Sequence, residues 1–509
     1  MLCGLVPPRL SEFDLSVYRL VVNRDHCLVR LLKNLPWHDF HEILAPYYSE
    51  KSGRPPTLPV LMLKLVYLCY QYNLSDREVI ARGTTDMAFR YFLQIPLAWK
   101  LPDPSSLCLF RARLGMEGFQ RVFDHVVHSA RELGVVKDRL RIKDATHVLA
   151  DIARPTALAL VAQTRERLLA LAEPFAPLLV EGERIKLKVL RETTQTLPLA
   201  ERLVARVAQL RDILAWVDDL TVPEDAETNS AWKKLSTQRD LAHHILADQE
   251  DPDRGDRTIS IADPDARHGK HGDWYDGYLT DILVDSDSQI ITAINVLPAG
   301  GDEAADAVEL ISHEETTHGN DVQALSIDGV GFKGPTLRKL EDPQGLHVDV
   351  FVPPPKEAES SFFRTQEFVE DPSTQTVTCP AGKRSTYHYY DAKSHATKYR
   401  FPRDACSTCP LLARCMAKVP ARHGRTVNKS DYQAEHERVR QRANTEQYRA
   451  IRREHPMVER KLGEMMNRHG GRHARYRGKW KVLLQELIIG VVVNAKRLMR
   501  LLCAPACTQ

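Results

Sequence analysis

Five β-rich segments, separated by stretches of helical spacing, constrain the fold of this chain more than any other feature. They are RLRIKDATHV, the two halves of DGYLTDILVDSDSQIITAINVLPAG, VQALSI and LHVDVFV. Short apolar runs between polar turns are typical of buried strands, and the polar turn at 285–288 predicts a hairpin. A helix is expected from Asp302 to about His313. The order strand, hairpin, helix, strand, strand predicts an α/β core with helices covering a mixed sheet.

Three acidic residues in this framework suit the role of metal-bound carboxylates. Asp144 and Asp328 are each expected to end an apolar strand and to lie at its carboxyl edge, whereas Glu459 falls in a charged, amphipathic helix. Such carboxylates can hold two divalent cations roughly 3.5–4 Å apart, which is an arrangement that breaks and makes phosphodiester bonds. The alternative is that they are ordinary solvated or ion-paired acids among the 67 Asp and Glu of the chain.

Composition bounds the class of protein. The chain has 509 residues, 43% of them hydrophobic, which is enough for two or three packed cores. It contains no apolar run of membrane-spanning length and no signal-peptide pattern at its start. Ten cysteines are too few for a disulfide scaffold in a chain of this length. We therefore expect a soluble protein of a reducing, intracellular compartment, without a membrane partner.

The net charge of +3 conceals a strongly basic segment. Residues 451–500 hold 13 Lys and Arg against 4 Asp and Glu, so the rest of the chain is acidic on balance. A basic segment around Glu459 favours a phosphate-backbone partner, although a solvated helix face would look the same. The candidate DNA-binding residues are Arg452, Arg453, Arg468, Arg472, Arg475, Arg477 and Lys479.

The pattern along the chain predicts six segments. Residues 1–135 read as a helical region, in which Ser75 and Glu78 form a capping-box signature and residues 53–56 a turn. This region is expected either to bind DNA through a helix-turn-helix unit or to serve helix packing alone. The remaining segments are a first core strand in 136–155, a helical insertion in 156–255, the main core in 256–355, an irregular cysteine-rich insertion in 356–430, and basic helices in 431–509 that complete the core.

Four cysteines cluster within the fifth segment. Cys406 and Cys409 have the CxxC spacing that clamps a tetrahedral metal, and Cys379 and Cys415 could complete a four-sulfur Zn²⁺ site. Such a closed site would be structural. Reduced thiols or a redox pair are the alternatives, and an iron–sulfur cluster is a weaker one.

With these segments in order, the chain resembles the DDE transposases of bacterial insertion sequences. The resemblance spans nearly the whole chain and is specific to a subgroup with an N-terminal helical domain and a cysteine cluster before the final glutamate. It rests on SGRPPTLPVLMLKLVYLC, NLSDREV, LPDPSSLCLFRARLG, DATHV, ADPDARHG, DGYLTDILVD, SIDGVGFKG, CSTCPLLARC and HPMVERKLGEMMNRHGGRHARYRG running to VVNAKRLMRLL. It implies an RNase H-like mixed sheet flanked by helices.

The resemblance also assigns roles to residues. Asp144, Asp328 and Glu459 take the positions of the family's catalytic acids, which would bind two Mg²⁺ or Mn²⁺. Tyr448 and Arg452 or Arg453 precede Glu459 much as a tyrosine and an arginine do in related transposases, but the spacing departs from the usual pattern. A lysine one to two helical turns after the glutamate is missing, since Met465, Met466 and then Arg468 occupy that stretch. Asp263 and Asp265 are interpreted as turn or support residues, with a metal role as the alternative.

The expected function is binding of the element's terminal inverted repeats, followed by metal-dependent cleavage and strand transfer into target DNA. The expected partners are double-stranded DNA and further copies of the chain, in the bacterial cytoplasm and at the nucleoid when bound to DNA. A catalytically degenerate DNA-binding protein and a structure-specific nuclease on the same fold are the alternatives.

Overall fold

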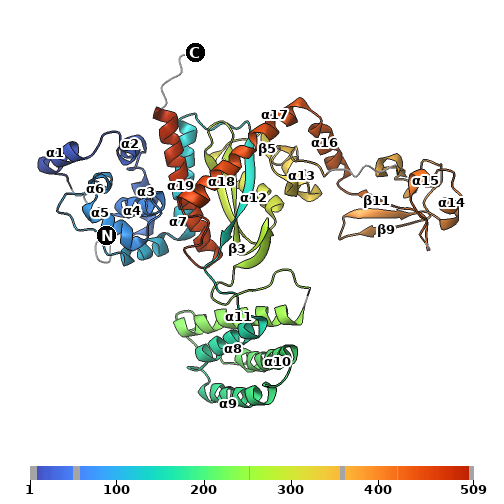
Figure 1. Cartoon of the computed structure of the whole chain (residues 1–509), viewed down its shortest axis with the longest axis horizontal. Helices are drawn as coiled ribbons and strands as arrows, with labels where there is room; N and C mark the ends of the chain where they lie inside the picture. The colour runs from blue at the N-terminus through green and yellow to red at the C-terminus, as the bar shows by residue number, and fades with distance from the viewer. Residues whose placement is uncertain (1–8, 50–57, 252, 356–361, 421, 504–509) are drawn as a thin grey trace.

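The computed structural model describes residues 9–49, 58–251, 253–355, 362–420 and 422–503 (Figure 1). The turn expected at residues 53–56 lies outside them. No helix in these ranges combines the length and the apolar character needed to cross a membrane.

The N-terminal part is helical, as its apolar spacing predicts. Its elements are α1 (Glu12–Val21), α2 (Cys27–Asn34), α3 (Phe40–Leu44), the 3-10 turn η1 (Ala45–Tyr47), α4 (Pro59–Gln71), α5 (Asp76–Thr85), α6 (Met87–Leu93) and α7 (Ser105–Glu132). The capping box at the start of α5 is confirmed, because Ser75 N–H donates to Glu78 Oε2 at 2.7 Å and Glu78 N–H to Ser75 Oγ at 3.3 Å.

A six-stranded mixed sheet forms the centre of the molecule. Its strands are β1 (Arg141–Leu149), β2 (Arg267–His271), β3 (Asp273–Asp285), β4 (Ile291–Pro298), β5 (Ala324–Ser326) and β6 (Asp349–Phe351). The strand order is β2-β3-β1-β5-β6, with β4 also paired to β3. The hairpin of β3 and β4 is confirmed, and β1 is antiparallel to β3 but parallel to β5, which is parallel to β6. This mixed α/β arrangement is compatible with a DDE transposase fold.

Three helical elements follow the hairpin. They are α12 (Glu303–His318), η2 (Gly329–Gly331) and α13 (Gly334–Leu340). The helix predicted from Asp302 is confirmed, with Asp302 as its N-cap, but it continues five residues beyond the expected end at His313. Ala307, Leu310 and Ile311 give it an apolar face that packs into one cluster with Leu283 of β3 and Leu325 of β5.

In chain order, a separate helical lobe lies between β1 and β2. It consists of α8 (Ala157–Ala172), α9 (Pro177–Thr194), α10 (Leu199–Asp218) and α11 (Ser230–Glu250), and it extends below the sheet in Figure 1. The lobe has its own apolar core, which includes Leu168 of α8, Val180 of α9, Leu210 of α10 and Ile245 of α11.

The described part of the segment 356–430, residues 362–420 and 422–430, is not irregular, contrary to the sequence prediction. It holds η3 (Thr365–Glu367), β7 (Val369–Asp371), β8 (Thr376–Thr378), β9 (Tyr387–Asp391), β10 (Ala396–Arg400), α14 (Arg403–Ser407), α15 (Leu412–Cys415) and β11 (Thr426–Ser430). The strands form a three-stranded and a two-stranded antiparallel sheet. They are only three to five residues long, so their alternation is too brief to be recognised in the sequence.

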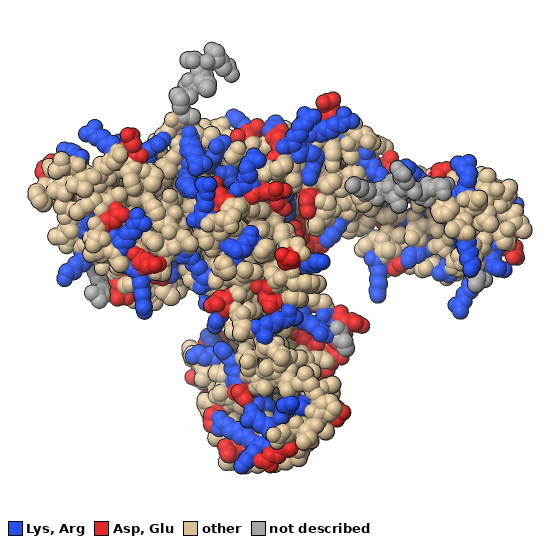
Figure 2. All heavy atoms as spheres, viewed as in Figure 1, with Lys and Arg blue, Asp and Glu red and all other residues tan. Residues whose placement is uncertain are grey.

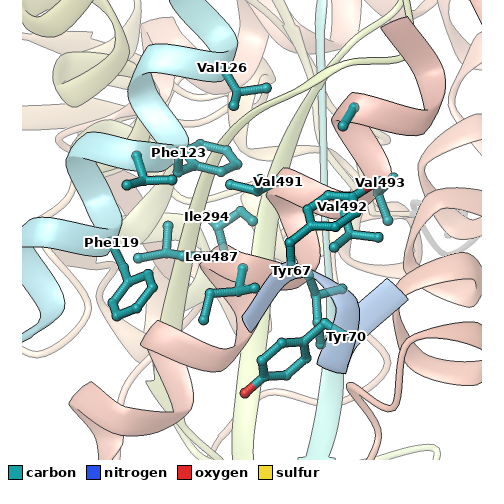
Figure 3. Close-up of a cluster of buried hydrophobic side chains, with 14 of the residues drawn as sticks. Tyr67, Tyr70, Phe119, Phe123, Val126, Ile294, Leu487, Val491, Val492 and Val493 are labelled. Carbon is teal, nitrogen blue, oxygen red and sulfur yellow. The ribbon is translucent and has the colours of Figure 1, made fainter. Parts of the chain in front are cut away.

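The C-terminal helices return to the core. They are α16 (Gln433–Ala443), α17 (Glu446–Glu454), α18 (Pro456–Arg468) and α19 (Lys479–Cys503). Figure 3 shows Leu487 and Val491 of α19 among Tyr67 of α4, Phe123 of α7 and Ile294 of β4. The N-terminal helices therefore share one hydrophobic core with the sheet and the last helix.

The close approach of α19 to this core requires glycine at position 490. A Cβ there would lie 2.5 Å from Ile294 Cδ1 and 2.8 Å from Phe123 Cε2. A larger residue would separate α19 from both α7 and the hairpin, because packed interiors leave no room for an added carbon.

Candidate active site

The pairing of β1 with β5 brings Asp144 and Asp328 to the same level of the sheet. The two strands are parallel, with Arg141 opposite Leu325 and Ile142 opposite Ser326. Asp144 and Asp328 each follow the second of these pairs by two residues. Two acids far apart in the sequence are thus placed close together, one on β1 and one just beyond the end of its neighbour β5.

The strand context of Asp144 differs from the prediction. Asp144 does not end its strand; it is the fourth of nine residues, and β1 continues to Leu149. The reason is that β3 pairs with β1 along all nine positions, whereas β5 pairs with it only at Arg141 and Ile142. Asp144 therefore lies where β1 loses one of its two neighbours, rather than at the end of the strand.

Asp328 lies two residues beyond the end of β5. It is the N-cap of η2, and its Oδ1 accepts a hydrogen bond from the Val330 N–H at 3.1 Å. The chain turns here, so the carboxylate is half-buried at the sheet edge. Its second oxygen is not used by this cap.

Glu459 reaches the same region from a helix. It lies in the first turn of α18, which packs against β1, and its side chain is exposed. Pro456 occupies the start of α18, where a missing N–H costs nothing. Glu459 therefore stands at the helix end where the macrodipole favours negative charge.

The three acids form one electrostatic cluster. The pKa of Asp144 is raised to about 7, mainly by burial and to a smaller extent by the negative charges of Asp328, Glu303 and Glu459. The pKa of Glu303 is itself raised, first by burial and also by Asp328. The site thus concentrates negative charge that the surrounding protein does not fully offset.

Glu303 was missed by the sequence analysis. It is the first residue of α12, directly after the N-cap Asp302, so an acid there reads as ordinary first-turn chemistry. Only the fold shows that this helix begins beside Asp144 and Asp328. The Asp-Glu pair at the helix start was the available signal.

Arg452 and His455 secure the end of β5. Arg452 Nη1 donates to the Ile327 carbonyl at 3.0 Å and to Ser326 Oγ at 3.2 Å, and that hydroxyl is 3.0 Å from His455 Nδ1. Burial lowers the pKa of Arg452, while Tyr448, Asp328 and Asp144 act in the opposite direction. The end of α17 therefore fixes the backbone that delivers Asp328.

The other candidate DNA-binding residues divide into two groups. Arg472 donates to the His147 carbonyl at 2.6 Å, and Arg475 donates to the Leu74 carbonyl at 2.8 Å. These two side chains join the segment after α18 to β1 and to the N-terminal helices. The residues Arg453, Arg468 and Arg477 are exposed and Lys479 is half-buried.

The remaining residues singled out in this part of the sequence serve the packing. Met465 and Met466 are buried in the main core, so the helix face after Glu459 is apolar where a lysine was sought. Asp263 Oδ1 accepts from the Tyr278 hydroxyl at 2.6 Å and from the Gly478 N–H at 3.0 Å, while Asp265 Oδ2 accepts from the Lys479 N–H. Both aspartates hold the start of α19, in keeping with their interpretation as support residues.

The four clustered cysteines also converge. Cys379, Cys406, Cys409 and Cys415 line one small hollow of about 20 Å³. Burial raises the pKa of Cys415, and the other three thiols contribute to the rise. The Arg425 N–H donates to Cys406 Sγ at 3.5 Å. Thiols from separate elements thus face one another around a common point.

The oxygen and sulfur atoms of both clusters are of the kinds that bind metal ions, but the side chains are not arranged in a metal-binding geometry. Within the described ranges, no group of three or more His, Cys, Asp or Glu side chains stands close enough to hold a metal ion. Burial and, after it, three neighbouring carboxylates raise the pKa of Asp144, and a divalent cation would supply positive charge there. Four thiols around one hollow suit Zn²⁺.

Comparison with known proteins finds two matching family models, both of transposase domains. The model described as a transposase domain (DUF772) matches residues 16–113, and the model described as a transposase DDE domain matches residues 378–499. The chain is 30% identical over 157 residues to an uncharacterized protein, ORF8 in the nfe locus of Rhizobium meliloti, a match covering 29% of this chain and 75% of that protein. No solved structure matches the chain.

Both matched models describe transposase domains, and DDE transposases are phosphoryl-transfer enzymes. The chain belongs to that class as a DDE transposase of an insertion sequence. The DDE match includes Glu459 and the cysteines, whereas Asp144 and Asp328 lie outside it.

Proposed function

We propose that this transposase binds the terminal inverted repeats of its insertion sequence and catalyses metal-dependent cleavage and strand transfer. Asp144, Asp328 and Glu459 are the proposed catalytic acids on an RNase H-like core. The observation that carries the proposal is the placement of the acids: β1 with Asp144 pairs in parallel with β5, which leads to Asp328, and α18 with Glu459 packs against β1.

The acids would act as ligands. Asp144, Asp328 and Glu459 would hold two Mg²⁺ or Mn²⁺, which activate a water or a DNA 3′-hydroxyl and stabilise the leaving 3′-oxygen in an in-line displacement. Asp328 is oriented by its own cap on Val330 and by the Arg452 contact with the preceding carbonyl. Glu303 adds negative charge beside the ligands.

The basic segment would hold the DNA. We propose that the exposed Arg453, Arg468 and Arg477, together with Lys479, contact phosphates, since such contacts release counterions and set affinity. Arg452, Arg472 and Arg475 would contribute through the backbone contacts that order the strands and the turn. The N-terminal helices share a core with the sheet, which would couple DNA held there to the acids.

The assembly follows from the reaction. Two ends of one element must be held together for paired chemistry, so we propose that the active form is a homo-oligomer, located on the nucleoid when bound to DNA.

The cysteine cluster is proposed as a structural Zn²⁺ site. It would stabilise a segment whose own apolar cluster is small and includes Phe363, Phe368 and Tyr399. Metal analysis of the purified chain should find one zinc that Cys406→Ser removes and Cys69→Ser, a buried cysteine of α4, retains. A zinc-free wild type that is fully folded would refute the site.

The test of function is cleavage and joining of a DNA that carries the element's own ends, with Mg²⁺ or Mn²⁺. We expect wild type to cut and join, and Asp328→Asn and Glu459→Gln to bind the same DNA without cutting. Cut ends that are never joined would identify a nuclease instead. Binding without cleavage by wild type would identify a degenerate DNA-binding protein.

A further inference from the structure

The helical lobe contains a hollow whose charge is almost entirely positive. It has a volume of about 510 Å³ and lies between the start of α8, the end of α9 and the first half of α10. Four arginines line it, with one acid, Glu192; the arginines are Arg165, Arg191, Arg202 and Arg206. We call it the arginine hollow.

Two of these arginines are buried with donors left over. Arg165 is 1% exposed and Arg206 is 7% exposed. Arg165 Nε and Arg206 Nη1 have no hydrogen-bond partner among the described residues. A buried guanidinium donor without an acceptor is costly, so the protein itself does not satisfy this cluster completely.

The protein supplies little negative charge here. Glu166 accepts from Arg165 Nη2 at 3.1 Å and also from Arg191 Nη2 at 3.3 Å, and it is 59% exposed. Burial lowers the pKa of Arg206, and the neighbouring Arg191 and Arg202 lower it further. Burial likewise lowers the pKa of Arg165. The cluster is thus held together despite mutual repulsion.

The first turn of α8 adds to the positive potential. Thr156 caps this helix of 16 residues, accepting from the Ala159 N–H at 3.2 Å, and both residues line the hollow. A helix N-terminus favours anions through its N–H groups and its dipole. The positive end of the helix dipole and the positive charges of the arginines therefore both attract an anion to the hollow.

Other arginines of the lobe are satisfied within the protein. Arg184 on α9 makes two hydrogen bonds to Glu173, at 2.7 and 2.9 Å, and Arg211 on α10 pairs with Glu250 at 2.6 Å. Arg165 and Arg206 differ from these two arginines, since each keeps a buried donor without a partner among the described residues. Figure 2 shows Lys and Arg gathered on the lower part of this lobe in the view drawn.

We propose that the arginine hollow binds a phosphate group, and that in the working protein this is a backbone phosphodiester of double-stranded DNA. Arginine binds phosphate oxygens through charge-assisted hydrogen bonds, and four guanidinium groups line the hollow. The exposed Arg191 stands at the edge of the hollow, where a long polyanion can enter. The choice of DNA rests on the proposed function, because β1, which carries Asp144, leads directly into α8.

The experiment uses the full chain and two probes. The first is a double-stranded DNA, with binding measured over a range of salt concentrations for wild type and for Arg202→Gln/Arg206→Gln. We expect the double variant to bind at least several-fold more weakly and to lose about one unit of the slope of log K against log salt. Arg202→Lys should keep the slope, and Arg184→Gln, on the same lobe, should behave as wild type.

The second probe is inorganic phosphate, compared with chloride at equal ionic strength. Phosphate should raise the melting temperature of wild type and of Arg184→Gln but not that of the double variant, because a ligand that binds only the folded state stabilises it. Circular dichroism checks that the lobe of each variant remains helical. If the double variant unfolds, Arg191→Gln, at an exposed position, replaces it in both measurements.

The outcomes separate the possible sources. A phosphate effect without any change in DNA affinity would overturn the DNA source and assign the hollow to a free phosphate compound. No effect in either arm would overturn the proposal. If wild type fails to bind DNA, the proposed function fails, and the phosphate arm alone decides the hollow.

Discussion

Strand β1 carries two sets of charged side chains: one set forms ion pairs within the protein, and the other has acids as neighbours. On one side, Arg141 is fully buried and pairs with Asp285 at 2.9 Å and with Glu314 at 2.6 Å. Lys143 is buried beside Asp281 in the same manner. Although burial opposes its ionisation, Arg141 lowers the pKa of Glu314. Each of these acids of β3 and α12 has a cation of β1 as its partner, although burial raises the pKa of Asp281 and of Asp285.

On the other side, Asp144 lies near Asp328, Glu303 and Glu459, and its carboxylate accepts a hydrogen bond from the Ala145 N–H at 2.9 Å. Its pKa is raised to about 7 by burial and by three neighbouring carboxylates, and Arg452, the nearby cation, is engaged with the Ile327 carbonyl. Charges that a protein balances internally stabilise its fold or at least do no harm, whereas charges left unbalanced call for an external partner. The same strand thus carries a structural network and a candidate cation site.

The largest effect is expected from removing the unbalanced acid. Asp144→Asn should lower the rate of DNA cleavage by about 1000-fold, because several kcal/mol of charge stabilisation depend on the metal ligands. Its thermal stability should equal or exceed that of wild type, since the substitution removes a repelled charge. A matched change within the balanced set, Asp285→Asn, should lower the melting temperature. Cleavage and unfolding are measured on both variants, and a strongly destabilised Asp144→Asn would refute the distinction.

The next effect concerns the balanced set. Arg141→Met leaves Asp285 and Glu314 buried without their cation and should cost about 3–5 kcal/mol of unfolding free energy. Arg139 provides the control, because it is 45% exposed and pairs with Asp287 and Glu454 at the surface. Arg139→Met should cost less than about 1 kcal/mol in urea unfolding. Equal losses in the two variants would contradict the account.

Glu486 is a buried acid in a third kind of environment, without an ion-pair partner and without other acids around it in the part of the chain that the structure describes. It is fully buried in α19, one oxygen has no hydrogen-bond partner among the described residues, and burial raises its pKa to about 8. Because the folded state binds a proton that the unfolded state releases above its ordinary value of 4.5, stability should fall as pH rises from about 4.5 to 8. Glu486→Gln should remove this dependence.

The difference between Glu486→Gln and wild type should therefore be small at pH 5 and reach about 2–4 kcal/mol at pH 8. Urea unfolding at several pH values measures it. A constant difference over this range would show that Glu486 is ionised in the folded protein.

The smallest effect is expected at Glu303, which supplies charge without a proposed ligand role. Glu303→Gln should reduce cleavage by about tenfold, in the range for side chains that surround metal ligands. Its neighbour Asp302 caps α12 and pairs with Lys333, so Asp302→Asn, which keeps a capping oxygen, is the matched control. A loss at Glu303 as large as at Asp144 would make it a fourth ligand.

Much of the architecture could be predicted from local patterns. The hairpin turn at 285–288, the capping box at Ser75 and the helix from Asp302 depend on neighbouring residues, so the sequence displays them directly. The two small sheets in 356–430 could not be predicted in this way, because their strands are too short to show a period. Asp144, Asp328 and Glu459 were selected as catalytic candidates mainly because they match motifs of the DDE transposase family.

What depends on register could not be read from the sequence. The position of Asp144 in mid-strand follows from how far β3 and β5 each pair with β1. The roles of Glu303 and of the arginine hollow arise from side chains that only the folded chain brings together. Arg472 and Arg475 look like DNA contacts in sequence, yet they bind backbone carbonyls hundreds of residues away.

The central claim, that the unbalanced acids on β1 and β5 form a cation site, is tested most directly by Mn²⁺ binding. Calorimetric titration of the full chain, with and without a DNA duplex, compares wild type with Asp328→Asn and with Asp287→Asn, a surface acid paired to Arg139. The account predicts saturable Mn²⁺ binding to wild type and Asp287→Asn, weakened at least about tenfold in Asp328→Asn. Equal binding to all three proteins, or no binding to any, would contradict it.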